Sequence, residues 1–209
     1  DRDRGAVDRV VEAERGVQRT FTTDRGVLCA AALPDGVHFV VGANGEVRLY
    51  HVDGTLVKTF KGHRMEVRVV AVTRDGRYII SASNDETIKV WCVASRSLLS
   101  ACIGHTAGVE KVAAMPDSQR ILSGGSYDDP TVRVWLLNGD LENTFTLHSS
   151  RVMALVPLPD NQHALSGSND NTIKLFNVND GAVLRTFRHH IQSVNYLALL
   201  PDGLRFVSG

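Results

Sequence analysis

Short apolar segments separated by turn-forming residues make up most of the chain, and residues 62–91 show this pattern most clearly. Runs of five or six residues rich in valine, isoleucine and aromatic side chains are separated by Asp75-Gly76 and Asn84-Asp85. Such dipeptides favour the tight turns of hairpins. The β-branched and aromatic residues between them favour strands over helices. The pattern therefore predicts three short β-strands joined by two turns.

The same pattern returns along the chain at an almost constant period. Four histidines are spaced by 42, 43 and 42 residues, a valine follows each after four positions, and a turn aspartate follows each valine after eight. The histidines are His63, His105, His148 and His190, and the aspartates are Asp75, Asp117, Asp160 and Asp202. A period near 40 with four short strands per unit is typical of the blades of a β-propeller.

The Gly-His pairs, the turn aspartates and the tryptophans Trp91 and Trp135 resemble the anchors of the WD-repeat (WD40) family over about residues 20–209. The resemblance implies an all-β, WD40-type β-propeller. We expect four complete four-stranded blades, one preceding outer strand at residues 17–21 and a truncated fifth blade, as part of a larger, seven-bladed ring. Residues 1–16 alternate in charge and are predicted to be a linker or short helix, which leaves residues 17–209 as the propeller domain.

The first repeat departs from the others. Its strands are predicted at residues 27–32, 38–42, 47–51 and 55–60, with one of its turns at Asn44-Gly45. Thr23 stands in place of the histidine, Asn44 in place of the turn aspartate and Tyr50 in place of the tryptophan. We therefore expect this blade to form without the internal hydrogen bonds of the later repeats.

In the WD-repeat family a histidine, a serine, an aspartate and a tryptophan form a buried hydrogen-bonded tetrad within a blade. These four residue types can satisfy one another in a dry interior. The resemblance assigns His63, Ser81, Asp85 and Trp91 to the second repeat; His105, Ser123, Asp129 (or Asp128, because of a two-residue insertion) and Trp135 to the third; and His148, Ser166 and Asp170 to the fourth. The fourth repeat ends in Phe176, which cannot donate a hydrogen bond.

A Ser-His-Asp set also suggests nucleophilic catalysis, but this set recurs in successive repeats. An acyl-transfer site is single and needs an oxyanion hole and a pocket. The histidines lie about 40 residues apart, which is not metal-ligand spacing. The sequence therefore predicts a protein that is not an enzyme, with no catalytic residue, no metal and no cofactor.

Composition narrows the possible partners. Lysine plus arginine and aspartate plus glutamate both number 23, and no basic run is present, which argues against nucleic acid and anionic membranes as partners. The longest apolar run, residues 27–33, is too short to cross a bilayer. Three cysteines without C-x-x-C spacing indicate a reducing compartment, so we predict a cytoplasmic protein.

The remaining candidate for function is the rim that the resemblance places at the histidine loops and aspartate turns. The candidate partner-binding residues are Arg64, Glu66, Arg68, Asn84, Glu110, Tyr127, Asp128, Arg151, Met153, Asn169 and Asn195. We predict a non-catalytic scaffold for protein partners in a multiprotein complex, and we expect an open edge of the propeller to self-associate.

Two alternatives stay open for this surface. The chain could be the targeting or regulatory domain of a larger multidomain enzyme. It could also be the substrate-receptor subunit of a ubiquitin-ligase complex, with Arg64, Arg68 and Arg151 reading phosphopeptides. Trp91 is followed by Cys92 and Trp135 by Leu136, so the Trp-Asp-x-Arg sequence that would support docking to a ligase adaptor is absent.

Overall fold

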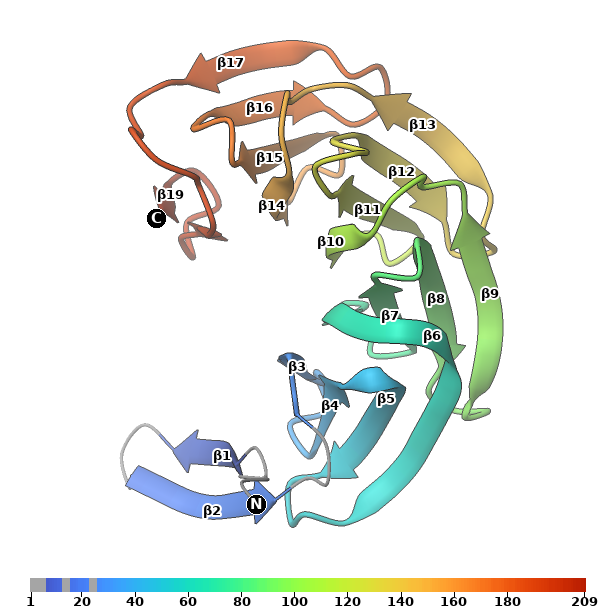
Figure 1. The fold of residues 1–209 in the computed structure, drawn as a ribbon. Helices are drawn as coiled ribbons and strands as arrows, with labels where there is room; N and C mark the ends of the chain where they lie inside the picture. The colour runs from blue at the N-terminus through green and yellow to red at the C-terminus, as the bar shows by residue number, and fades with distance from the viewer. Residues whose placement is uncertain (1–6, 13–15, 23–25) are drawn as a thin grey trace, which may run out of the picture.

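The computed structural model describes residues 7–12, 16–22 and 26–209. Antiparallel sheets follow one another along an arc, with β3, β10 and β14 nearest the centre and β9, β13 and β17 on the outside (Figure 1). The described residues contain no helix. The chain is therefore all-β, as the turn and strand pattern predicts.

The N-terminal described segments form a hairpin of β1 (Val7–Glu12) and β2 (Gly16–Thr22). The prediction of a linker or short helix for residues 1–16 is wrong for Val7–Glu12, where half of the residues are valines and favour a strand despite the flanking charges. The strand expected at residues 17–21 lies in β2, but it pairs with β1 and is not a lone strand. Residues 1–6, 13–15 and 23–25, which include Thr23, lie outside the described residues.

The first two predicted blades form one seven-stranded sheet. Its strands are β3 (Cys29–Ala32), β4 (His38–Gly42), β5 (Asn44–His51), β6 (Leu56–Val72), β7 (Tyr78–Ser83), β8 (Thr87–Cys92) and β9 (Ser97–Ile103). The first part of the 17-residue β6 pairs with β5 and the second part pairs with β7. The two four-stranded blades that the sequence predicts are thus present as β3–β6 and β6–β9, and β6 runs on from the first into the second.

The predicted turn at Asn44-Gly45 joins β4 to β5, where Gly42 pairs with Val47 and the Ala43 N–H donates to the Glu46 carbonyl at 3.0 Å. Asn44 begins β5 and pairs with Glu66 of β6, and Gly45 adopts a positive φ of 69°. This conformation is accessible to glycine at little cost and allows the two strands to separate locally.

The third and fourth repeats are separate four-stranded antiparallel sheets, as expected. The third contains β10 (Val109–Ala114), β11 (Arg120–Gly125), β12 (Val132–Leu136) and β13 (Leu141–Phe145); the fourth contains β14 (Val152–Pro157), β15 (His163–Ser168), β16 (Ile173–Asn177) and β17 (Val183–Phe187). In the truncated fifth repeat, β18 (Leu197–Leu199) pairs with β19 (Phe206–Ser208).

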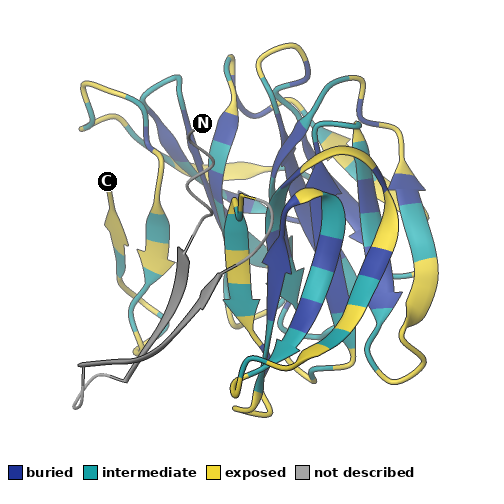
Figure 2. Ribbon diagram, turned by 60° about the horizontal axis from the view of Figure 1, so that its bottom comes forward, coloured by how far each residue is buried: buried dark blue, intermediate teal, exposed yellow. Residues whose placement is uncertain are grey.

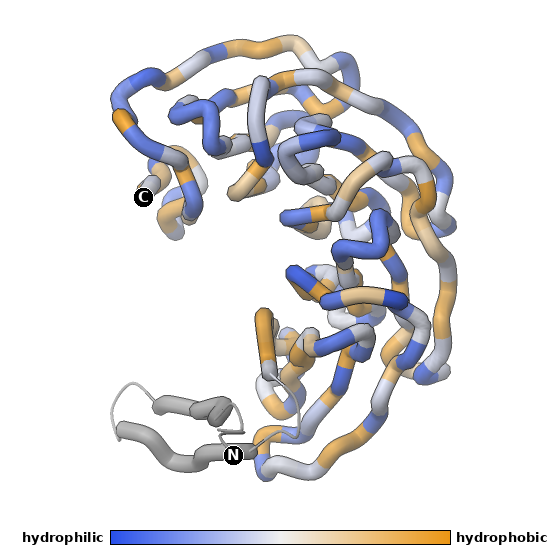
Figure 3. The backbone as a smooth tube through the Cα atoms, in the orientation of Figure 1, coloured by the Kyte–Doolittle hydropathy of each residue, from blue (hydrophilic) through white to orange (hydrophobic). Residues whose placement is uncertain are grey.

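Apolar side chains fill the spaces within and between neighbouring sheets. Buried positions gather in the strands and exposed positions at the loops (Figure 2), and apolar and polar residues alternate along the backbone (Figure 3). In one cluster, Trp91 packs with Phe60 at 5.3 Å between ring centroids. Because each cluster draws residues from more than one strand or sheet, stability depends on contact between neighbours.

Glycines in the second strands of several sheets allow the next sheet to pack closely. A Cβ atom at Gly124 would lie 2.6 Å from Val152 Cβ, and one at Gly167 would lie 2.8 Å from Val194 Cγ1. Gly42 faces Val67 in the same way, at 2.7 Å. Larger side chains at these positions would push the sheets apart.

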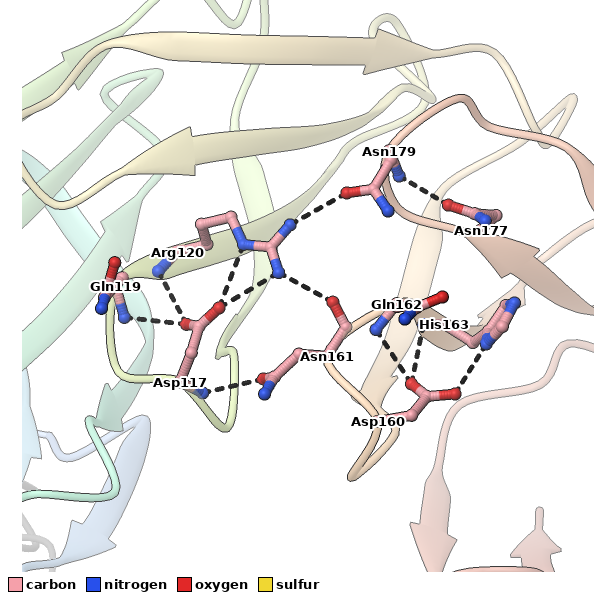
Figure 4. Close-up of polar contacts among 9 residues, drawn as sticks. All are labelled: Asp117, Gln119, Arg120, Asp160, Asn161, Gln162, His163, Asn177 and Asn179. Atoms are coloured by element: carbon pink, nitrogen blue, oxygen red, sulfur yellow. Dashed lines mark hydrogen bonds and ion pairs between the residues drawn. The ribbon is translucent and has the colours of Figure 1, made fainter.

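Polar contacts at the turns also join the third and fourth sheets. Arg120 lies between Asp117, Asn161 and Asn179 (Figure 4). Its Nη2 donates to the Asn161 carbonyl at 2.7 Å and to Asp117 Oδ2 at 3.1 Å, and its Nη1 donates to Asn179 Oδ1 at 3.1 Å. The backbone N–H of Asp117 donates to Asn161 Oδ1 at 2.8 Å. One arginine thus connects a turn of one sheet to two turns of the next.

Gly124→Ala should destabilise the packing of the third sheet on the fourth. The added methyl group would overlap Val152, and such overpacking typically costs about 1–3 kcal/mol of the free energy of unfolding. Gly26→Ala is the matched control, because a Cβ atom there meets nothing within 4 Å. Denaturant unfolding of both variants tests this, and an unchanged stability of Gly124→Ala would contradict the close packing.

Candidate functional site

The second repeat contains a continuous chain of hydrogen bonds through four side chains. Trp91 Nε1 donates to Ser81 Oγ at 2.8 Å, Ser81 Oγ lies 2.8 Å from His63 Nε2, and His63 Nδ1 lies 2.9 Å from Asp85 Oδ2. Because the indole can only donate, the serine accepts from it and donates to the histidine. It follows that the His63 proton lies on Nδ1 and is donated to Asp85. This chain joins β6, β7, β8 and the turn between β7 and β8.

The third repeat has the same arrangement, and its aspartate is Asp129. His105 Nδ1 lies 2.6 Å from Asp129 Oδ2, His105 Nε2 lies 2.8 Å from Ser123 Oγ, and Trp135 Nε1 donates to Ser123 Oγ at 2.8 Å. Asp128 is exposed. The two-residue insertion therefore lengthens the turn before the aspartate without displacing it from the histidine.

In the fourth repeat the arrangement lacks the indole donor. His148 lies 2.8 Å from both Ser166 Oγ and Asp170 Oδ2, while Phe176 is fully buried in the position of the tryptophan. Leu147 precedes this histidine and packs in the same apolar cluster as Phe176. The smaller aromatic ring leaves room there for a leucine.

The corresponding residue in the second and third repeats is a glycine. A Cβ atom at Gly62 would lie 3.2 Å from Trp91 Cη2, and one at Gly104 would lie 3.2 Å from Trp135 Cη2. The Gly-Trp and Leu-Phe combinations therefore fill the same space in two ways.

A threonine that sequence reasoning missed completes each network. Thr87, Thr131 and Thr172 donate to an oxygen of the aspartate two residues earlier, at 2.7, 2.6 and 2.6 Å. The signal was present as an Asp-x-Thr sequence in all three repeats. The residue after each histidine also donates its backbone N–H to the same aspartate, as Arg64 does to Asp85 at 2.8 Å.

These contacts set the charges of the network. Burial lowers the pKa of His63, His105 and His148 in spite of the adjacent carboxylates. Burial alone would raise the pKa of Asp85, but hydrogen bonds from Thr87 and from the backbone of Arg64, together with His63, hold the pKa at about 2. At neutral pH each network therefore contains a neutral imidazole and a carboxylate.

The order of hydrogen bonds is that of a Ser-His-Asp triad, but access is different. Ser81, Ser123 and Ser166 all have a relative exposure of 0%. A nucleophile has to reach its substrate. These serines instead hold neighbouring strands together.

The candidate rim residues differ in their exposure. Arg64, Glu66, Tyr127, Asp128, Arg151 and Asn195 are exposed; Arg68, Asn84, Met153 and Asn169 are partly buried; and Glu110 is buried. Arg68 Nη2 donates to Glu110 Oε2 at 3.3 Å, and Arg151 Nη1 lies 3.9 Å from Glu110 Oε1. Glu110 thus connects arginines from the sheets on either side of its own. The Oδ1 atom of Asn169 is buried without a hydrogen-bond partner among the described residues.

A cavity of about 640 Å³ opens where β6 bulges away from β5. The pairing passes from Glu46 with Lys61 to Asn44 with Glu66, so residues 62–65 lie opposite Gly45 alone. We call this the bulge cavity, and its lining residues are Asn44, Gly45, Glu46, Lys61, Gly62, His63, Arg64, Met65, Glu66 and Asn84. Sequence reasoning missed it, because it depends on the irregular pairing of β6 with β5 opposite this turn.

Two other kinds of site are absent from the described part of the chain. Nowhere in residues 26–209 or the two N-terminal strands do three or more His, Cys, Asp or Glu side chains gather so that they could hold a metal ion. Within the same ranges, no helix has the length and apolar character needed to cross a membrane.

Ser123→Ala and Ser166→Ala should differ in their effect on stability. Ser123→Ala removes the hydrogen-bond partner of both His105 Nε2 and Trp135 Nε1, whereas Ser166→Ala removes only that of His148 Nε2. Each unpaired buried group costs about 1–3 kcal/mol, so we expect Ser123→Ala to lower the free energy of unfolding by about that much more. Denaturant unfolding measures the difference, and equal losses would show that the indole bond contributes nothing.

Acid should destabilise the chain in two steps. The buried histidines have an ordinary pKa of 6.5 that folding lowers, so the unfolded chain binds more protons as the pH falls through 6.5. Their contribution is fully present above that pH and decreases below it. Asp85, with an ordinary pKa of 3.8 lowered to about 2, adds a further loss below pH 4.

Denaturant unfolding at pH 7.5 and pH 5.5 tests the histidine step. His189→Gln, at an exposed histidine, is the control and should keep the same dependence on pH. A free energy of unfolding at pH 5.5 that equals or exceeds the value at pH 7.5 would contradict the conclusion that the buried histidines are neutral.

Comparison with known proteins agrees with this architecture. The family model described as "WD domain, G-beta repeat" matches residues 54–92, 96–135 and 139–177, which is more than half of the chain. The three matches begin just before β6, β9 and β13, and they end in β8, β12 and β16 respectively.

Several curated proteins are similar to the chain. "Autophagy-related protein 16" of Arabidopsis thaliana is 26% identical over 83% of this chain and 34% of its own length. "COMPASS component SWD3" of Saccharomyces cerevisiae is 28% identical over 83% of this chain and 59% of its own length. An F-box protein of the same yeast is 30% identical over 76% of this chain and 25% of its own length. The chain spans less than two thirds of each relative. With three matched repeats on sheets braced by His-Ser-Asp networks, the chain belongs to the WD-repeat (WD40) family.

Proposed function

We propose that this chain is a non-catalytic interaction module that presents its rim to protein partners in a multiprotein complex. The observation that carries the proposal is the contrast between the two sets of polar residues. The His, Ser and Asp side chains that resemble a catalytic set are buried and bonded to one another. The polar side chains next to them along the chain, such as Arg64 in β6 and Asp128 in the turn after β11, are exposed beside the residues that those networks fix in place.

The composition of this rim suits protein recognition. Arg64, Arg151 and Tyr127 are exposed, and arginine and tyrosine are enriched at the centres of protein interfaces. Among the similar proteins, one is by name a component of a complex, the COMPASS component. Mixed charge on the rim and the absence of a basic run support protein partners over nucleic acid or membranes. Cys29, Cys92 and Cys102 are free thiols, which supports a cytoplasmic location.

Two alternatives keep some support. The similar proteins extend well beyond the part that the chain matches, which suits a targeting or regulatory domain of a larger multidomain enzyme. Similarity to an F-box protein favours a substrate receptor of a ubiquitin ligase. Against a phosphopeptide pocket, Arg68 and Arg151 both face the Glu110 carboxylate, which leaves Arg64 as the unpaired arginine of that set among the described residues.

Tyr127→Ala combined with Met153→Asp should remove partners from the rim. Tyr127 is 65% exposed and Met153 partly exposed, so neither change removes a core residue. Reversing the charge of Arg68 is avoided, because it would set two carboxylates against each other at Glu110. The measurement is quantitative crosslinking and pull-down from native extract, with Leu98→Asp on the outer strand β9 as control. If the double variant keeps every partner of the unchanged chain, the rim is the wrong surface.

Self-association is a further proposal, based on the exposed apolar residues of the fifth repeat. Ile191 is 91% exposed, Leu204 88% and Tyr196 74%. Large apolar side chains that are exposed to solvent favour association. We expect sedimentation velocity to show dimers or larger species whose fraction rises with concentration, and Ile191→Glu with Leu204→Lys to reduce that fraction. A monodisperse monomer that melts cooperatively would contradict this.

A further inference from the structure

The bulge cavity has the size of a binding site. Its volume of about 640 Å³ falls within the range of about 300–1,000 Å³ that is usual for ligand pockets. Gly45, at a positive φ of 69°, forms part of its wall, and a Cβ atom there would lie 3.0 Å from the carbonyl oxygen of His63. Any other residue at this position would crowd the backbone of β6 beside the cavity.

The accessible charges around the cavity have a positive excess. Glu46 is largely buried and pairs with Arg48 at 2.9 Å, so its charge is already balanced. Lys61 lies 3.8 Å from Glu46 but its side chain is 77% exposed, and the Arg64 guanidinium has no partner among the residues described. Glu66 accepts a hydrogen bond from the neutral Asn84 amide at 3.3 Å. Two accessible cations therefore face one accessible carboxylate, which favours a ligand with a negative group.

The cavity also offers an apolar surface and two amides. Met65 lines it and is 54% exposed, and methionine side chains adapt to differently shaped apolar partners. Asn44, at the start of β5, and Asn84, in the turn after β7, both line the cavity, and an amide side chain can donate to and accept from a peptide group. Cation, thioether and amides together match a peptide better than a free anion.

We propose that the bulge cavity binds a short peptide segment with a carboxylate side chain next to an apolar one. The carboxylate lies at Arg64 and Lys61, the apolar side chain contacts Met65, and the amides of Asn44 and Asn84 bond the peptide backbone. This proposal rests on the proposed function, because it names the partner chemistry for one end of the rim.

The three methionines of the chain allow a direct test. In a chain labelled with ¹³C-methyl methionine, Met65 reports on the bulge cavity, Met153 on the central part of the rim and the fully buried Met115 on the fold. The probes are acetyl-Leu-Glu-Leu-amide and its Gln and Lys analogues. We expect the Glu peptide to shift the Met65 resonance saturably while Met115 stays fixed, and the two analogues to bind more weakly.

Charge variants separate recognition from a structural effect. Arg64→Gln should weaken binding of the Glu peptide by up to about fivefold, as partly exposed charge pairs do, and Glu66→Gln should strengthen it. Arg74→Gln, at an exposed arginine outside the cavity lining, is the matched control and should change nothing. An unshifted Met115 resonance in each variant shows that the fold is retained.

Three outcomes would overturn the proposal. They are a Met65 resonance that does not move, equal binding of the three peptides, and equal effects of Arg64→Gln and Arg74→Gln. A shift of Met153 alone would overturn it while leaving the rim as a partner surface. The proposed function fails separately, in the pull-down with the rim variant.

Discussion

The structure depends on a line of hydrogen bonds that passes from indole to hydroxyl to imidazole to carboxylate inside a dry sheet. Each group satisfies the next, so a set of polar side chains can be buried without an unpaired donor. In the second repeat the line begins at Trp91 on the third strand, crosses the second strand and ends at Asp85 in the turn. It therefore fixes the part of β6 around His63 and the turn that contains Asp85 at once. The exposed residues that we propose as contacts for partners lie on these segments. The buried hydrogen bonds therefore hold the proposed partner surface in place.

The repeats differ from one another in ways that follow from this line. The fourth repeat exchanges tryptophan for Phe176, and Leu147 takes the space that the larger ring would need. The first repeat has Asn44 at the aspartate position, where an amide replaces the carboxylate that ends the line in later repeats. There β6 runs on as one strand from the first blade into the second, and the bulge opposite Gly45 leaves a cavity. The bulge cavity thus lies beside Asn44, the position at which the first repeat departs from the regular pattern.

Much of this could be predicted from the sequence, because the responsible signals are local and repeated. The constant spacing of the histidines and turn aspartates was enough to predict the strands, and the resemblance to the WD-repeat family implied the tetrads. The insertion left Asp128 and Asp129 as alternatives, since only the distance to His105 distinguishes them. The strand at Val7–Glu12 was not predicted, because the alternating charges of residues 1–16 indicated a linker or short helix, whereas the three valines of this segment favour a strand. The burial of Glu110 could not be found, since it depends on arginines brought from two other sheets.

The most direct test of the buried network is hydrogen exchange at the two indole N–H groups, observed in a chain labelled with ¹⁵N-tryptophan. Trp91 and Trp135 are the only tryptophans, and both donate to serines with 0% exposure. The account predicts two slowly exchanging indole protons, protected to the level of the free energy of global unfolding. Exchange of either proton at the rate of a free indole would show that the hydrogen-bonded line is not closed, and would contradict the account.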